Sequence, residues 1–169
     1  MDGKVLVAYG SKYGATAGIA QKIGETLQQE GFPAEVLSAE KVTDVNRYNA
    51  VVLGSAAYMF RWRKEVAGFL KKNEKQLAEK PVWLFTSGPL EEGDPVKLLE
   101  NKIIPTSLQP IIDRIKPREV TVFHGAIDIN KLNFFEKFVM NRIKSSLGDF
   151  RKWDDITAWA KSIADTLKK

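Results

Sequence analysis

A run of small and polar residues, Ser11-Lys12-Tyr13-Gly14-Ala15-Thr16, separates an apolar segment from an amphipathic one. This arrangement is typical of a strand-to-helix turn, where free backbone N–H groups and the helix N-terminus create a positive end that binds phosphate. Ser11 and Thr16 could add hydroxyl donors, and Gly14 allows close approach because it has no Cβ. We therefore interpret the run as a candidate phosphate loop, with a plain helix cap as the alternative.

The common nucleotide loops do not fit this run. A P-loop requires G-x-x-x-x-G-K-[ST], but Ala15 and Thr16 follow Gly14 and no lysine is present. The spacing from Gly10 to Gly14 does not supply the G-x-G-x-x-G of dinucleotide-binding domains. A phospho-receiver domain needs acidic Mg²⁺ ligands at the ends of its first and third strands, where this chain has Gly and Ser.

The elements that must position this loop alternate between two periodicities. Short apolar runs end at or near Gly or Ser, and helical stripes such as Ile19, Ile23 and Leu27 lie between them. The predicted strands are Lys4–Tyr9, Ala34–Ser38, Ala50–Gly54, Pro81–Ser87 and Glu119–Gly125. Strands that are apolar on both faces and alternate with helices predict an α/β fold, a doubly wound five-stranded parallel sheet in the order 2-1-3-4-5 with helices on both faces. A ligand then binds at the carboxyl ends of the strands, where the phosphate loop lies.

Composition limits the chemistry that the chain can perform unaided. The chain has 169 residues, is 44% hydrophobic and contains no cysteine, which predicts one domain over residues 1–169 and excludes disulfides, thiolate metal sites and a cysteine nucleophile. Redox chemistry would therefore depend on a bound cofactor. The N-terminal apolar run is too short for a signal peptide or a membrane span, so we expect a cytoplasmic protein.

Together these features resemble a known family. S-K-Y-G-A-T followed by a helix is similar to the flavodoxin phosphate loop, which binds the 5′-phosphate of FMN, and the strand order is the flavodoxin-like one. The resemblance continues through Gly54–Trp62 and Thr86–Leu90, segments that hold the isoalloxazine ring in flavodoxins. The C-terminal part, beginning FHGAIDIN and ending GDFRKWDDITAWA, resembles the branch of flavodoxin-domain proteins that includes quinone-dependent protoporphyrinogen oxidase.

The resemblance implies FMN as the cofactor, bound by three loops. The implied cofactor-binding residues are Ser11, Lys12, Tyr13, Gly14, Ala15, Thr16, Ser55, Ala56, Ala57, Tyr58, Met59, Trp62, Thr86, Ser87, Gly88, Pro89 and Leu90. A flat apolar ring with a polar edge needs aromatic or aliphatic faces and main-chain donors and acceptors, which these loops can offer. Trp62 has a second interpretation, because an aromatic residue at helical spacing from Val66 is often part of the core. No metal ligands are predicted, and we assign no role to the single histidine, His124.

The charge of the chain differs from that of ordinary flavodoxins, which are acidic. The formal net charge is +5, and residues 129–153 hold six basic residues against two acidic ones. An apolar stripe recurs within this segment, at Leu132, Phe135, Phe138, Val139, Ile143 and Leu147. A basic amphipathic segment favours contact with an anionic membrane surface or an acidic partner, although we expect the stripe itself to pack in the core.

Three functional classes remain open from the sequence. The favoured one is an FMN-binding flavodoxin-like electron-transfer protein or oxidoreductase, in which FMN does the redox chemistry and a redox partner protein or a quinone exchanges electrons with it. The alternative is a quinone-dependent protoporphyrinogen oxidase at the membrane surface. The third is a binding module that has lost its cofactor. Nucleic acid is not an expected partner, since no recognition motif accompanies the basic residues.

Overall fold

A parallel sheet forms the centre of the molecule. The structure is a computed structural model and describes residues 3–58, 60–142 and 147–169. The main strands are β1 (Val5–Gly10), β2 (Ala34–Ser38), β3 (Ala50–Tyr58), β5 (Val82–Ser87) and β6 (Glu119–Phe123). They run parallel in the order β2-β1-β3-β5-β6, which confirms the predicted 2-1-3-4-5 order of five parallel strands.

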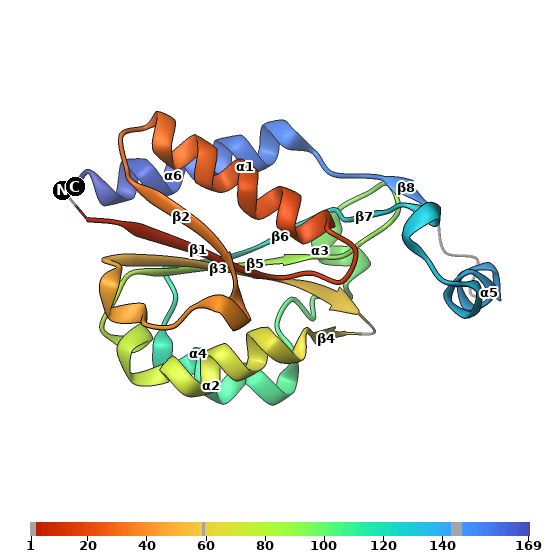
Figure 1. The fold of residues 1–169 in the computed structure, drawn as a ribbon, viewed down its shortest axis with the longest axis horizontal. Helices are drawn as coiled ribbons and strands as arrows, with labels where there is room; N and C mark the ends of the chain where they lie inside the picture. The colour runs from red at the N-terminus through yellow and green to blue at the C-terminus, as the bar shows by residue number, and fades with distance from the viewer. Residues whose placement is uncertain (1–2, 59, 143–146) are drawn as a thin grey trace.

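Helices cover both faces of this sheet, as predicted. Helices α1 (Ala15–Gln29) and α6 (Trp153–Leu167) lie together on one face, and α2 (Lys64–Ala78) and α4 (Gln109–Ile115) lie on the other (Figure 1). The predicted stripe of α1 is completely buried, because Ile19, Ile23 and Leu27 all face the sheet. The fold follows from strands that are apolar on both faces and therefore require a helical layer on each side.

Two apolar cores fill the space between the sheet and its helical layers. On the side of α1 and α6, the rings of Phe85, Phe123 and Trp159 form a cluster with centroids 5.5 to 6.1 Å apart. Phe85 also explains a glycine in the sheet. Its ring lies against the neighbouring Gly54 of β3, where an added Cβ would come within 1.9 Å of the ring.

Several short elements were not predicted. Strand β3 continues through Tyr58, and β4 (Arg61–Trp62) turns back to pair with it in the antiparallel direction. Two further strands, β7 (Ala126–Ile127) and β8 (Gly148–Asp149), form a small antiparallel pair. The remaining short elements are helix α3 (Pro95–Leu98) and the single 3₁₀ turns Ala39–Lys41, Val45–Arg47, Thr106–Leu108 and Ile129–Lys131.

The basic segment corrects one expectation from the sequence. Its helix, α5 (Phe134–Arg142), stands away from the sheet and its helical layers (Figure 1). Of the predicted core stripe, Leu132 is buried, but Phe135 and Phe138 are 71% and 52% exposed. Ile143 lies outside the described residues, and Leu147 is 37% exposed. Val139 is half-buried and lines a cavity. The prediction that this stripe packs in the core was therefore wrong for Phe135 and Phe138, because their side of α5 faces away from the sheet and its helical layers, and for Leu147, which follows this helix.

Candidate functional site

A cavity of about 480 Å³ opens at the carboxyl ends of β1, β3 and β5. All three predicted loops contribute to it, so the strand-end cavity lies where the parallel topology requires a ligand site. Its wall contains these residues of the three loops: Ser11, Lys12, Tyr13, Ala15, Thr16, Ala56, Ala57, Ser87, Gly88 and Leu90. Six further residues complete it: Arg63, Gly125, Ala126, Ile127, Val139 and Met140.

The N-terminus of α1 faces this cavity without a side-chain cap. Gly14 is the N-cap residue, with a φ of 95° that favours glycine, and no side chain of the described residues caps the helix. The Ser11 hydroxyl instead accepts the N–H of Gly14 itself, at 3.0 Å. The first-turn N–H groups of Ala15 and Thr16 have no partner within the helix, and both residues line the cavity. This arrangement leaves backbone donors free for an anion.

Thr16 connects the first loop to the third. Its side chain is 1% exposed, and its Oγ1 lies 2.8 Å from Oγ of Ser87, where either hydroxyl could donate. A hydroxyl has one proton and two lone pairs. When Ser87 donates to Thr16, the proton of Thr16 is therefore available to an acceptor in the cavity.

Four of the predicted ligand residues lie behind the wall of the cavity. Trp62 is buried in the core beside α2, and its indole N–H donates to Oγ1 of Thr86 at 2.9 Å. Thr86 in turn donates to the carbonyl of Ile103. The Ser55 hydroxyl donates to the carbonyl of Ala56 and accepts the N–H of Arg63. The Pro89 carbonyl accepts the N–H of Gly125. These groups hold the loops in place. Of the two interpretations of Trp62, the structure supports the one in which its side chain packs in the core near Val66.

The other predicted residues divide as follows. Gly14 borders a neighbouring pocket, while Met59 and the side chain of Tyr58 lie outside the described residues. Gly88 is tightly enclosed, since an added Cβ would lie 3.2 Å from Cβ of Ala57. Its N–H donates to the carbonyl of Phe123 at 3.2 Å, which ties this loop to the end of β6.

Sequence reasoning missed one wall of the cavity. Gly125, Ala126 and Ile127 follow β6, and Val139 and Met140 belong to α5. The first three could have been found from topology, because β6 ends at the same edge of the sheet as the other strands. Val139 belonged to the predicted apolar stripe but was not assigned to a ligand site, and no signal marked Met140, because the contribution of both depends on where α5 lies.

Glu136 anchors α5 to the phosphate loop. Its carboxylate forms an ion pair with Lys12 and accepts the hydroxyl of Tyr13 at 2.5 Å. The hydrogen bonds from Lys12 and Tyr13 lower the pKa of Glu136 to about 2. The same carboxylate raises the pKa of Lys12, while burial raises that of Tyr13. The loop that would bind phosphate is therefore also the attachment point of α5.

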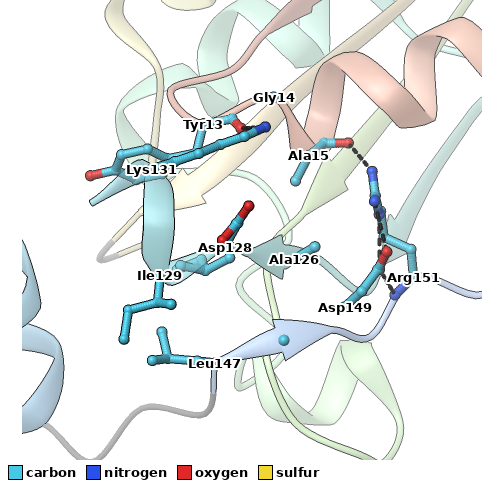
Figure 2. A pocket seen from close by; sticks show the side chains of 12 residues that line it. Tyr13, Gly14, Ala15, Ala126, Asp128, Ile129, Lys131, Leu147, Asp149 and Arg151 are labelled. Atoms are coloured by element: carbon cyan, nitrogen blue, oxygen red, sulfur yellow. Dashed lines mark hydrogen bonds and ion pairs between the residues drawn. The ribbon is translucent and has the colours of Figure 1, made fainter.

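An adjoining pocket of about 530 Å³ lies beside the same loop (Figure 2). Lys131 donates from Nζ to the carbonyl of Tyr13 at 3.1 Å, and Arg151 donates to the carbonyl of Ala15 at 3.3 Å. Arg151 is also paired with Asp149 at 2.7 Å. Two cations thus support the backbone of the phosphate loop from the side of the segment that follows β6.

Other chemistry has little support among the described residues. No group of acidic or histidine side chains within 3–58, 60–142 and 147–169 could hold a metal ion. His124 is 4% exposed and its Nε2 has no hydrogen-bond partner in the part of the chain that the structure describes. It does not line the strand-end cavity. None of the helices in the described ranges is long and apolar enough to cross a membrane.

A doubly wound parallel sheet in the order β2-β1-β3-β5-β6, with helices on both faces, is the flavodoxin fold, and comparison with known families agrees. Residues 6–154 match the family described as Flavodoxin domain. The chain therefore belongs to the flavodoxin domain family. No curated protein matches the chain.

Solved structures show the same fold at low sequence identity. Flavodoxin 2 from Bacillus cereus, in its oxidised form, is 19% identical, with a TM-score of 0.63 and coverage of 98% of this chain and 99% of that one. A flavodoxin from the domain Archaea is 15% identical, with a TM-score of 0.61 and coverage of 98% and 99%. Rubredoxin oxygen:oxidoreductase from Desulfovibrio gigas is 17% identical, with a TM-score of 0.63, and the match covers 98% of this chain but 36% of that chain.

Proposed function

We propose that the chain binds FMN in the strand-end cavity and acts as an electron-transfer flavoprotein. The observation that carries this proposal is the uncapped N-terminus of α1, which opens into a cavity large enough for a cofactor. When bound, FMN supplies the exchange of electrons, and the protein supplies binding and orientation.

The residues present suit the two halves of such a cofactor. The N–H groups of Ala15 and Thr16, together with the hydroxyls of Ser11 and Thr16, would hold a phosphate. The apolar residues Ala57, Leu90, Ile127 and Met140 line the same cavity as Gly88 and would contact the ring. Gly88 suits this place because a Cβ there would lie 3.2 Å from Cβ of Ala57, closer than an ordinary contact.

Only one loop of the described residues has the features of a phosphate loop, whereas FAD has two phosphates, so we expect FMN to be the tight ligand. The electron donor and acceptor would be a partner protein or a quinone that reaches the open side of the cavity. Anaerobic reduction of the reconstituted protein, followed by mixing with a soluble quinone or a redox protein, tests this role. Rapid reoxidation by one of them supports electron transfer.

A more specific alternative is that the protein oxidises protoporphyrinogen with a quinone as the electron acceptor. The reconstituted protein tests this alternative when it is mixed with both compounds. Turnover of that substrate would make the protein an enzyme of that class. Failure of the reconstituted protein to retain any flavin would contradict both versions of the proposal.

A further inference from the structure

Helix α5 presents an unpartnered aromatic face, which we define as Phe134, Phe135 and Phe138. Their side chains are 89%, 71% and 52% exposed. At 3.6 residues per turn these positions lie on one side of the helix, and Arg142 follows one turn after Phe138. Burying even one phenylalanine from water is favourable, so three on a nine-residue helix are an unusual exposure.

The orientation of α5 is fixed by its opposite face. Glu136 holds the phosphate loop through Lys12 and Tyr13, and Met140, one turn later, is buried in the cavity wall. The aromatic face is exposed because the other side of the helix is already occupied, although Phe135 also borders a small pocket beside Lys12 and Tyr13. Figure 1 shows α5 at the end of the molecule, apart from the sheet and its helical layers.

The charge around the aromatic face is positive. Lys137 and Arg142 lie on the same helix, and the Arg142 guanidinium is 5.3 Å from the ring centroid of Phe138. The only carboxylate on α5 is paired within the domain, since Glu136 forms an ion pair with Lys12, and Asp149 of the flanking segment is paired with Arg151. Asp128, Asp154 and Asp155 lie beside the flanking residues Ile129 and Trp153, not on α5. Three more apolar side chains on the flanking segments are partly exposed: Ile129, Leu147 and Trp153.

We propose that the aromatic face of α5 docks the protein on an anionic lipid bilayer. Exposed phenylalanines beside Lys and Arg fit the boundary between headgroups and acyl chains, where the rings leave water and the cations stay near lipid phosphates. The bilayer is favoured as the occupant because the other charges of α5, on Lys137 and Arg142, are cationic and its one carboxylate, Glu136, is paired with Lys12. This docking goes beyond flavin binding and does not depend on it.

Sedimentation with vesicles tests this proposal on the full chain. Vesicles of equal parts phosphatidylglycerol and phosphatidylcholine should bind the protein at 0.1 M salt, whereas pure phosphatidylcholine vesicles should bind at least tenfold less. Raising salt to 1 M shortens the Debye length from about 10 Å to about 3 Å and should release most of the protein. The triple variant Phe134→Ser/Phe135→Ser/Phe138→Ser should lose at least tenfold in binding with an unchanged melting temperature, because these side chains are exposed.

A charge reversal and its matched control complete the experiment. Lys137→Glu/Arg142→Glu should abolish binding to the anionic vesicles, whereas Lys71→Glu/Lys72→Glu, on the exposed side of α2, should change it by less than twofold. Equal losses in the two pairs would mean that net charge alone drives binding, and would overturn the proposal. So would wild-type protein that stays in the supernatant. Concentration-dependent dimers that vanish in the triple phenylalanine variant, without vesicle binding, would assign the face to a second copy of the chain.

Discussion

Thr16 is the residue on which the phosphate-loop interpretation depends most. It is buried, it lines the cavity, and its hydroxyl is bonded to Ser87 from a loop that is distant in sequence. The bond to Ser87 serves the fold, and the place of Thr16 in the cavity wall allows it to serve an anion as well. Its two roles can be separated by comparing ligands with and without a phosphate.

Thr16→Ala is expected to weaken FMN binding by about 1.5–3 kcal/mol, because a charge-assisted hydrogen bond to the phosphate is lost. Riboflavin, which lacks the phosphate, should lose much less, and Thr16→Ser should retain most of the FMN affinity. Titration of flavin fluorescence measures all three. The matched control is Thr26→Ala, a buried threonine of the same helix that bonds the Lys22 carbonyl, which should leave flavin binding unchanged. Equal losses for both flavins in Thr16→Ala would reduce this residue to a structural role.

Glu136 offers a pH-dependent test of how α5 is attached. Its pKa is about 2 in the folded protein and 4.5 ordinarily, so its ion pair stabilises the fold fully above about pH 4.5 and is lost as pH falls toward 2. The melting temperature of Glu136→Gln should therefore lie below that of the wild type at pH 6, and the gap should narrow by pH 3. Glu79→Gln, at a carboxylate with no ion pair among the described residues, serves as the control and should show no such trend. A gap that is constant from pH 6 to pH 3 would contradict the attachment.

At the scale of elements, the contact between β3 and β5 can be tested through Gly54. An added Cβ would lie 1.9 Å from the ring of Phe85, so Gly54→Ala should lower the free energy of unfolding by about 1–3 kcal/mol. Phe85→Leu should recover part of that loss in the double variant, because it removes the obstructing ring. Gly68→Ala, where nothing lies within 4 Å, should instead stabilise α2 by about 0.5–1 kcal/mol. Urea unfolding measures each value, and an unperturbed Gly54→Ala would refute the packing described here.

The same scale shows what the sequence could and could not predict. The alternation of strands and helices followed from the periodicities, because these are local patterns. The strand order and the edge that carries the cavity followed from the rules of doubly wound parallel sheets. The exposed face of α5 could not be predicted, because an apolar stripe with residues such as Phe135 and Phe138 has the same helical spacing whether it faces a core or water. Trp62 was ambiguous for a related reason: helical spacing gives a direction, and only the folded structure shows that Thr86 and the core lie there.

At the scale of the whole molecule, the flavodoxin fold brings two surfaces to one end. The strand-end cavity lies under α5, whose inner side contributes Val139 and Met140 and whose outer side carries the aromatic face. Because Glu136 of α5 forms an ion pair with Lys12, binding of a membrane or partner to α5 could change the position of the loop that contains Lys12. The cavity and the docking face are therefore neighbours through a single short helix.

Binding of FMN should raise the stability of the entire domain. A ligand at 100 times its Kd stabilises the folded state by about 2.7 kcal/mol, which would shift the melting temperature upward by several degrees. Riboflavin at the same concentration should give a smaller shift, since it cannot occupy the N-terminus of α1. Differential scanning fluorimetry with both flavins measures the difference, and identical shifts would argue against a phosphate site.

The central claim is tested most directly by identifying the flavin that the protein retains. The protein is reconstituted with an equimolar mixture of FMN, FAD and riboflavin, freed of excess ligand, and denatured, and the released flavin is identified by mass spectrometry. We predict FMN at close to one per chain, because the first turn of α1 offers free donors to one phosphate and no other part of the chain that the structure describes has such a loop. Release of mainly FAD, or of no flavin at all, would contradict this account.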